Sequence, residues 1–183
     1  IAKITGIKMC ESYNFQHKTN YLCLMPCNAF GPNDNYDLLT SHFFPALIRR
    51  LSDAARSKKK SITLWGTGKA KREFIYVDDI ADACIFFMNK KTKHSLINIG
   101  SEEENTVKQC AEKVKKKIEK KFGKKIQIKF DNNKSIDGTP RKVLDCSLAR
   151  SYGWKKKVSF EKGLELTLKD FFSRKKNYRK IKF

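Results

Sequence analysis

The stretch of sequence that decides the fold runs from Tyr21 to Arg50 and reads YLCLMPCNAFGPNDNYDLLTSHFFPALIRR. Its first six residues are almost continuously apolar, which is typical of a strand buried on both faces of a parallel sheet, and Pro26 ends that run. A long polar loop follows, and then an amphipathic helix that the pattern starts at a Ser41 cap. Ligands of open α/β sheets bind beyond the carboxyl ends of the strands, where long loops are usually functional. The polar loop is therefore the candidate site.

Length and composition indicate a globular protein. With 183 residues, 40% of them hydrophobic, the chain can form one sizeable core, or one domain and part of another. No apolar run approaches the roughly 20 residues that a membrane span needs, and no signal-peptide pattern is present, so we expect a cytoplasmic protein without a membrane partner. Six cysteines without a Cys-x-x-Cys pair favour reduced thiols over a disulfide framework or a metal site.

The charge of the chain is strongly positive. Lys and Arg together number 40 against 19 Asp and Glu, which gives a formal charge of +21 and would ordinarily favour nucleic-acid binding. The excess is mostly lysine on expected helix faces and in the tail, so a solvated surface is the preferred interpretation. A basic nucleic-acid-binding module remains the alternative from a different class, and salt-dependent retention on DNA would favour it.

Periodicity and capping residues predict the remaining elements. They are a helix through Tyr13, a hairpin of strands 62–65 and 72–77 around a turn at 66–69, a helix 80–88 capped by Asp78-Asp79, a strand 96–100, a helix capped by Asn105 and ended by Gly123, a strand 126–130, a helix 147–153, and a last helix capped by Ser159.

The most specific pattern is Trp65-Gly-x-Gly-x-x-x-Arg72-Glu73-Phe-x-x-Val-Asp-Asp. An indole can stack on a base or sugar, and an arginine can bind a diphosphate with two hydrogen bonds. Alternatively, Trp65 is a core residue and Arg72 a surface partner of Glu73. The residues alone do not separate these readings.

Together with Pro26–Asn35, Ser41-His42, Pro45–Arg50 and the run DGTPRKVLD from Asp137, this pattern resembles the GDP-L-fucose synthases. These are extended short-chain dehydrogenase/reductases that convert GDP-4-keto-6-deoxy-D-mannose to GDP-L-fucose. The resemblance covers about residues 1–174. It implies an α/β fold that holds the C-terminal part of a Rossmann-type parallel sheet and a small α/β substrate-binding domain. Residues 1–35 would end the NADP-binding domain, residues 36–174 would form mainly the substrate domain with returns to the sheet near 73–100, and residues 175–183 would be a basic tail.

The resemblance also implies roles for individual residues. The reaction epimerises C3 and C5 of the sugar and reduces C4 with NADPH, in a homodimer joined through the helix that begins at Ile1. Catalysis would involve Lys3 and His42, which would also contact NADP(H). The other implied contacts are Pro26, Cys27, Asn28 and Ala29 with the cofactor, and Arg50, Trp65, Arg72, Asp137 and Lys142 with the GDP-sugar.

Purely structural roles for some of these residues remain open. Lys3 could be a solvated helix lysine, His42 could cap the helix or pack beside Ser41, and Asp137-Gly138 could be an ordinary tight turn. Among enzymes, the nearest alternative is another extended reductase, a nucleotide-sugar 4-epimerase or a 4,6-dehydratase.

The sequence contains no Gly-x-Gly-x-x-Gly that could cradle the pyrophosphate of a dinucleotide, only Gly66-Thr67-Gly68 in an expected turn. With Lys3 as the lysine, the tyrosine of the family's Tyr-x-x-x-Lys pair would fall two residues before Ile1. We therefore expect the chain to correspond to the C-terminal half of an enzyme and to be inactive alone.

Overall fold

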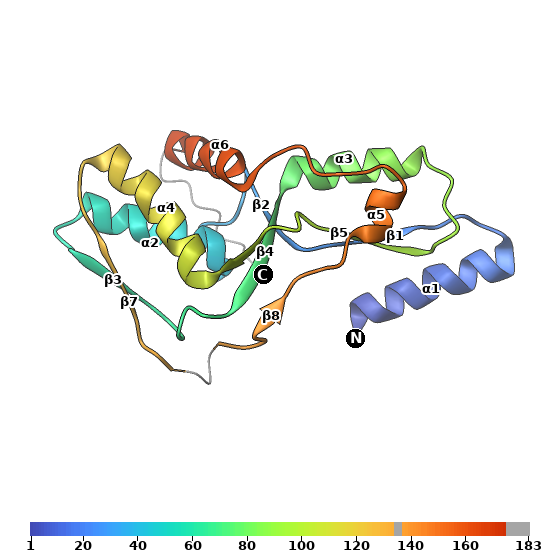
Figure 1. Cartoon of the computed structure of the whole chain (residues 1–183), viewed down its shortest axis with the longest axis horizontal. Helices are drawn as coiled ribbons and strands as arrows, with labels where there is room; N and C mark the ends of the chain where they lie inside the picture. Colours follow the sequence, from blue (N-terminus) through green and yellow to red (C-terminus); the bar gives the residue numbers. More distant parts are fainter. Residues whose placement is uncertain (134–136, 175–183) are drawn as a thin grey trace.

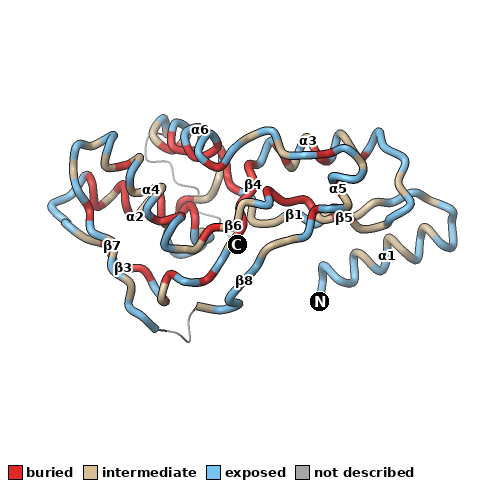
Figure 2. Tube along the Cα trace, viewed as in Figure 1, coloured by how far each residue is buried: buried red, intermediate tan, exposed pale blue. Residues whose placement is uncertain are grey.

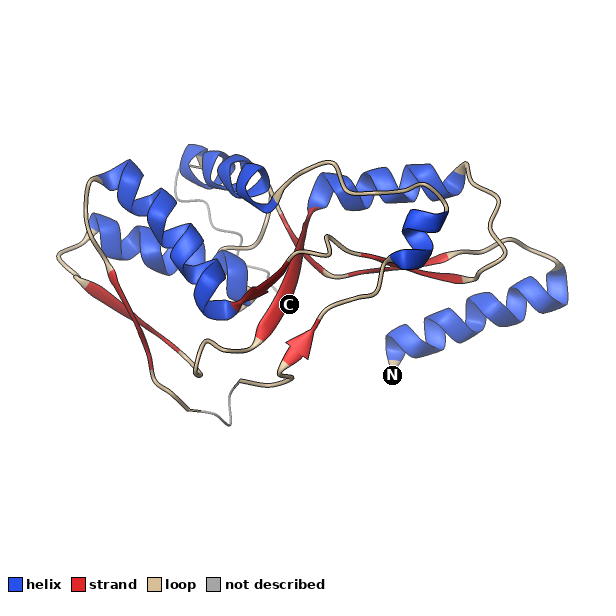
Figure 3. Cartoon of the chain, viewed as in Figure 1, coloured by secondary structure: helices blue, strands red, loops and turns tan. Residues whose placement is uncertain are grey.

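The computed structural model describes residues 1–133 and 137–174, so the predicted basic tail lies outside the described residues. The helices and strands alternate along the chain and form an α/β fold, as predicted (Figure 3). In chain order they are α1 (Ala2–His17), β1 (Cys23–Pro26), β2 (Asn28–Phe30), α2 (Phe43–Arg56), β3 (Ser61–Leu64), β4 (Lys71–Tyr76), α3 (Val77–Met88), β5 (Leu96–Ile99), β6 (Glu104–Thr106), α4 (Val107–Phe122), β7 (Gln127–Phe130), β8 (Arg141–Lys142), α5 (Ser147–Ser151) and α6 (Phe160–Ser173).

Strand β4 lies at the centre of the elongated molecule (Figure 1). Its second half pairs in parallel with β2, and its first half pairs antiparallel with β6 and parallel with β8. Toward one end of the molecule, β1 and β5 form a parallel pair beside α1, α3 and α5; toward the other, β3 and β7 pair in parallel near α2 and α4. Within residues 1–133 and 137–174, every strand pair except β4–β6 is thus parallel.

The predicted hairpin of residues 62–65 and 72–77 is wrong. Strand β3 pairs with β7, with Ile62 opposite Ile128, and β4 takes other partners. The glycines between them do turn the chain, with φ of 81° at Gly66 and 74° at Gly68. The turn leads β4 away from β3 instead of back along it, because Ile62 and Leu64 bury their side chains in a core that β7 and α2 also line.

Strand β1 is also more exposed than predicted. The sequence predicted burial on both faces, but Met25 is 37% exposed and Pro26 is exposed. Among the described residues only β5 pairs with β1, and α1 contains no buried residue, so one edge and part of one face of this strand stay open.

Two hydrophobic cores meet at β4. Successive side chains of a strand point to opposite faces, and accordingly Phe74 and Tyr76 enter the larger core while Ile75 enters the smaller one. Buried residues are concentrated in α2, α4, α6 and β4, whereas α1 is exposed or half-buried throughout (Figure 2). Phe30, Phe44 and Phe160 pack against Phe74 in the larger core, with ring centroids 5.0–6.4 Å apart.

Glu73 lies between the two cores and is completely buried. Its Oε1 accepts a hydrogen bond from Glu102 N at 2.7 Å, and its Oε2 accepts one from Leu144 N at 2.8 Å. Glu102 belongs to the β5–β6 connection and has a left-handed backbone with φ of 59°. One carboxylate therefore holds two connections that run between the cores.

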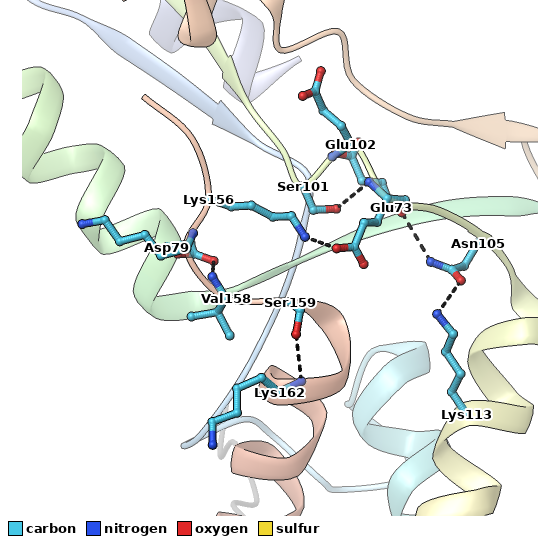
Figure 4. Close-up of polar contacts among 12 residues, drawn as sticks. Glu73, Asp79, Ser101, Glu102, Asn105, Lys113, Lys156, Val158, Ser159 and Lys162 are labelled. Carbon is cyan, nitrogen blue, oxygen red and sulfur yellow. Dashed lines mark hydrogen bonds and ion pairs between the residues drawn. The ribbon is translucent and has the colours of Figure 1, made fainter. Parts of the chain in front are cut away.

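The helix caps only partly follow the sequence. The Ser159 cap of α6 is confirmed, since its hydroxyl accepts from Lys162 N (Figure 4). The Asn105 cap of α4 is wrong: Thr106 and Gln109 form a capping box, and Asn105 accepts from Lys113 Nζ at 2.9 Å. Threonine and asparagine are both good N-caps, so the sequence made Thr106 as good a candidate as Asn105. In the structure Asn105 belongs to β6 and its side chain contacts Lys113 of α4 instead of the start of the helix.

Two further predicted caps are wrong. Asp78 and Asp79 lie in the first turn of α3, whose N-cap is Tyr76. Asp79 is buried and its carboxylate instead accepts from the backbone of Lys157 and Val158, at 2.8 and 3.1 Å (Figure 4). For α2, His42 takes the N-cap position without a side-chain cap bond, and the Ser41 hydroxyl is buried with no partner among the described residues.

Gly163 is the point where α6 meets the aromatic cluster. A Cβ there would lie 2.8 Å from Phe30 Cζ and 3.0 Å from Tyr76 Cδ2. Gly163→Ala is therefore expected to lower the free energy of unfolding by about 1–3 kcal/mol through overpacking, despite the better helix propensity of alanine. Gly6 in α1 is a matched control, because nothing lies within 4 Å of a Cβ there. Urea unfolding of Gly6→Ala should show no loss, and equal effects of the two substitutions would contradict the packing argument.

Candidate active site

A cavity of about 500 Å³ lies where β2, β4, the start of α2 and the turn after β3 come together. Six of the residues singled out in the sequence line it, from five separate segments of the chain. They are Asn28, Ala29, His42, Trp65, Arg72 and Asp137. The fold thus brings together the polar loop and the two most specific sequence motifs.

The other predicted site residues do not line this cavity. Lys3 is exposed on α1, Pro26 ends β1, and Lys142 is exposed on β8. Arg50 is half-buried on α2 and donates to Thr63 O at 3.0 Å. Their roles toward cofactor or substrate stay predictions.

Cys27 follows β1 and is held there by a backbone bond from its N to Ile99 O. Burial raises the pKa of its thiol to about 12, and the charge of Glu73 adds to the shift. A thiol with so high a pKa is almost wholly protonated at neutral pH, and the thiolate is the reactive form. This protonated thiol gives no support to a nucleophilic role, and Cys27, which does not line the cavity, keeps its cofactor contact as a prediction.

The loop that leads to His42 is tied down along its length. Asn33, with φ of 65°, donates its N–H to Asp170 of α6, and Arg174 donates to the side-chain oxygen of Asn33. Further along, Asp37 Oδ1 accepts from the backbone of Leu39 and Thr40. The loop is thus a structured support, and it places His42 at the mouth of the cavity.

His42 sits at the N-terminus of α2, where its carbonyl accepts from Ala46 N at 3.1 Å. Its side chain is exposed and forms part of the cavity wall. The N-cap reading therefore holds for the backbone of His42, while its imidazole stays accessible from the cavity.

Arg72 lines the cavity from β4 and binds the backbone of the segment that contains Asp137. Its Nη1 donates to the carbonyls of Lys71 and Thr139, both at 2.8 Å, and its Nη2 donates to Asp137 O at 3.1 Å. The alternative of a surface pair with Glu73 is wrong, because the Glu73 carboxylate is fully buried and bound to two backbone N–H groups. Arg72 instead orders the segment around Asp137 while lining the cavity.

Asp137 holds the turn that carries Trp65. Its carboxylate accepts from the N–H of Thr67 at 2.7 Å and from the Thr67 hydroxyl at 2.5 Å, and these bonds lower the pKa of Asp137. A Cβ at Gly66 would lie 2.2 Å from Asp137 Oδ1, so the approach requires glycine. Trp65 is 72% exposed at the cavity wall, which excludes the alternative of a core residue.

Asp34 is the site residue that the sequence analysis missed. It is half-buried and lines the cavity with His42. Burial raises the pKa of Asp34, while its own loop N–H at Asn35 and the charges of His42 and Arg174 oppose that rise. Its sequence signal was weak, because an aspartate between two asparagines is ordinary in a loop.

Residues 1–133 and 137–174 hold neither a metal-type cluster nor a membrane-spanning helix. Within these residues, no three His, Cys, Asp or Glu side chains are grouped as a metal site would require. None of the described helices has the length and apolarity to cross a bilayer.

The chain is similar to known proteins over most of its length. It is 44% identical over 169 residues to "Probable GDP-L-fucose synthase 1" of Oryza sativa subsp. japonica, covering 92% of this chain and 50% of that protein. A GDP-L-fucose synthetase structure from Naegleria fowleri matches with a TM-score of 0.85 at 23% identity, covering 98% of this chain and 56% of the other. A GDP-mannoheptose C4 reductase structure from Campylobacter jejuni with NADP bound matches with a TM-score of 0.76 at 30% identity, covering 94% and 59%.

The chain spans about half the length of the curated relatives it matches. The Naegleria structure has the same fold, which confirms the predicted Rossmann-type α/β fold. The model of the NAD dependent epimerase/dehydratase family matches residues 1–100, which is more than half of the 183 residues. By this match, and by the motifs gathered around its cavity, the chain belongs to the NAD dependent epimerase/dehydratase family.

Proposed function

We propose that this chain forms the sugar-nucleotide-binding half of an NADP(H)-dependent enzyme that converts GDP-4-keto-6-deoxy-D-mannose to GDP-L-fucose. The observation that carries the proposal is the cavity in which His42, Trp65, Arg72 and Asp137 meet from separate segments. The 44% identical rice relative, whose name is that of such a synthase, supports the choice of substrate.

The cavity suits a polar ligand with one flat and one anionic part. Trp65 offers an exposed indole that can stack on a ring, and Arg72 offers a guanidinium at the cavity wall. Arg50 on α2, which donates to Thr63 O of β3, and Lys142 on β8 are further cations of this part of the molecule, and we assign them to the same diphosphate. Asp137 positions the indole through its bonds to Thr67.

His42 carries the acid/base chemistry in this half of the site. The C4 ketone of the sugar acidifies the hydrogens at C3 and C5, so each can be removed by a base and returned by an acid from the opposite face. An imidazole can exchange protons near neutral pH, and the structured loop holds His42 at the cavity.

The residues at the end of β1 and in β2 suit binding of the nicotinamide part of NADP(H). Asn28 and Ala29 line the cavity, and Asn28 Nδ2 donates to Glu73 O at 2.8 Å, which fixes this side chain at the cavity wall. We assign Lys3, Pro26, Cys27, Asn28, Ala29 and His42 to the nicotinamide side of NADP(H), which when bound supplies hydride for reduction at C4. The sequence holds no glycine-rich pyrophosphate cradle, so we expect the chain alone to bind NADP(H) only weakly.

The assembly we propose is a cytoplasmic homodimer joined through α1. Support comes from the surface of that helix: it buries no residue, and Ile4, Met9 and Phe15 are 65%, 56% and 78% exposed. The domain boundary near residue 35 stays part of this proposal.

The deciding experiment is a product assay with the natural full-length protein. Incubation with GDP-4-keto-6-deoxy-D-mannose and NADPH should yield GDP-L-fucose, identified by NMR of the isolated sugar nucleotide. In parallel incubations with an unmodified UDP- or GDP-hexose, inversion at C4 alone would identify a 4-epimerase, and loss of water would identify a 4,6-dehydratase. Either result would replace the proposed reaction.

Arg72→Ala is expected to raise the KM for the GDP-sugar by about 10–100-fold, because hydrogen bonds to charged groups contribute about 1.5–3 kcal/mol. NADPH affinity should not change. Arg72→Lys should restore only part of the loss, since lysine keeps the charge and lacks the planar fork. Arg141→Ala is the control, because Arg141 is an exposed arginine that pairs with Glu104 and does not line the cavity. Steady-state kinetics measures all three, and an unchanged KM for Arg72→Ala would exclude Arg72 from substrate binding.

A further inference from the structure

The C-terminal ends of α2 and α4, with the connections that follow them, lie together at one end of the elongated molecule (Figure 1). Gln127 N donates to Lys60 O at 2.8 Å, and Lys124 donates to carbonyls at the end of α2. We name residues 54–60 and 120–125 the basic end. They contain no Asp or Glu and eight cations, which are Arg56, Lys58, Lys59, Lys60, Lys120, Lys121, Lys124 and Lys125. The fold thus gathers two lysine runs that are far apart in the sequence.

Part of this charge serves the helices themselves. Cations near a helix C-terminus offset the partial negative charge of its last carbonyls. Lys124 does this for α2, since its Nζ donates to Ala54 O at 3.0 Å and to Ser57 O, and Lys125 pairs with Glu119 at 3.6 Å. The other cations of the basic end are exposed, and in the part of the chain that the structure describes none of them forms an ion pair. The basic end therefore presents positive charge that no carboxylate within it offsets.

Two aromatic rings bring cations of both helices together. Arg56 Cζ lies 5.6 Å from the ring centroid of Phe122 and 5.8 Å from that of Phe172. Lys121 Nζ lies 4.6 Å from the Phe172 centroid, so cations of α2 and α4 share one ring. Attraction between a cation and an aromatic face offsets part of the repulsion between the two like charges. The half-buried rings are thus occupied by the protein's own cations instead of being open to a ligand.

We propose that the basic end binds the phosphate backbone of a double-stranded nucleic acid without reading its sequence. Lysine ammonium groups act as point charges, which bind phosphate without requiring a fixed geometry. A duplex carries one charge per about 1.7 Å of its axis, whereas an extended acidic peptide carries at most one per about 3.3 Å. A cluster of cations therefore gains more from a duplex, because more condensed counterions are released on binding.

Other polyanions fit this surface less well. Single strands are held largely by stacking of their bases on exposed aromatic side chains, and helices that bind membranes add apolar side chains that enter the lipid. The large apolar side chains that are exposed within residues 1–133 and 137–174 all lie outside the basic end. The surface thus offers charge alone, which suits the regular backbone of a duplex.

The proposed site is separate from the cavity. His42 is at the N-terminus of α2 and the basic end is at its C-terminus, and a helix of 14 residues is about 21 Å long. The residues that line the cavity include none of the basic end. The inference therefore does not depend on the proposed enzymatic reaction.

The test measures binding of a fluorescently labelled RNA duplex of about 20 base pairs to this chain, by anisotropy in about 50 to 300 mM KCl. The triple variant Lys58→Gln, Lys59→Gln, Lys60→Gln should weaken binding and lower the slope of log K against log salt by about 2–3, since each phosphate contact contributes about 0.9. Lys59→Gln alone should lower the slope by about 1. The control is Lys90→Gln, Lys91→Gln, Lys93→Gln, which removes the same charge from exposed lysines after α3, toward the opposite end of the molecule (Figure 1). The control should keep the native slope.

Several outcomes would overturn the proposal. Equal losses in the two triple variants would show that only net charge matters, and absence of binding at the lowest salt would exclude the site. Equally tight binding of one strand of the duplex would exclude duplex recognition. Displacement of the duplex by polyglutamate, or by phosphatidylserine vesicles, at equal charge concentration would identify an acidic protein or a membrane as the partner instead. A DNA duplex of the same length should compete, because phosphates alone are contacted, and its failure to compete would show contacts to the ribose hydroxyl groups and overturn the backbone-only binding.

Discussion

His42→Asn in the full-length protein is expected to slow at least one epimerisation by about 10²–10⁴, which is the usual contribution of a general acid or base. The reason is positional as well as chemical. The imidazole lines the cavity from the N-terminus of α2, on a loop that α6 fixes through Asp170 and Asn33. Asparagine keeps the polarity and remains a good N-cap, so the fold and α2 should be retained while proton exchange is lost.

The measurement is exchange of solvent deuterium into C3 and C5 of the sugar, followed by NMR. NADPH affinity is measured beside it and should stay close to the native value. His94→Asn serves as the matched histidine control on the exposed β5 side of the molecule. If both carbons exchange at the native rate in His42→Asn, His42 is structural and the acid/base assignment is wrong.

Glu73→Ala is expected to lower the free energy of unfolding by about 3–5 kcal/mol. The substitution removes the acceptor of the Glu102 and Leu144 N–H groups, at about 1–3 kcal/mol each where water cannot replace it, and it leaves a cavity at the fully buried Glu73 site. It also releases Glu102, whose left-handed backbone depends on such support. The two cores should then lose part of their connection.

Urea unfolding of this chain measures the effect. Glu73→Gln should fall between the native chain and Glu73→Ala, because one amide oxygen can still accept while the amide nitrogen faces an N–H donor. Glu161→Gln is the control, since Glu161 is an exposed carboxylate in the first turn of α6. Equal stability of Glu73→Ala and Glu161→Gln would show that the buried bonds contribute nothing net, as happens when a buried charge costs as much to desolvate as it gains.

Several features of the molecule could be predicted from sequence because they depend on near neighbours along the chain. The helices α2, α4 and α6 repeat apolar residues at helical spacing, and the Ser159 cap and the Gly123 stop are set within one helical turn. The candidate site was also found in part, since the motifs around His42, Trp65, Arg72 and Asp137 were recognisable one by one, and these residues do share a cavity.

Strand partners and the choice between adjacent caps could not be predicted in this way. Alternating apolar residues show that β3 is a strand, but they are equally compatible with a hairpin to β4 and with the parallel pairing to β7 that the structure contains. Likewise Asn105 and Thr106 had similar capping propensity, and only the position of Lys113 decided between them.

The sequence by itself determined where the helices and the strands β1, β3, β4, β5 and β7 form, because backbone periodicity and turn chemistry act over a few residues. The short strands β2, β6 and β8 were not predicted, since each is defined by its pairing with β4. Tertiary structure decided the burial of Glu73, the bonds of Asp79 to Lys157 and Val158, and the approach of Asp34 to the cavity of His42. Those contacts join groups across the fold or depend on the path of a tethered loop. The stability of these contacts depends on desolvation and on geometry in the packed molecule, and neither can be predicted from a pattern of neighbouring residues.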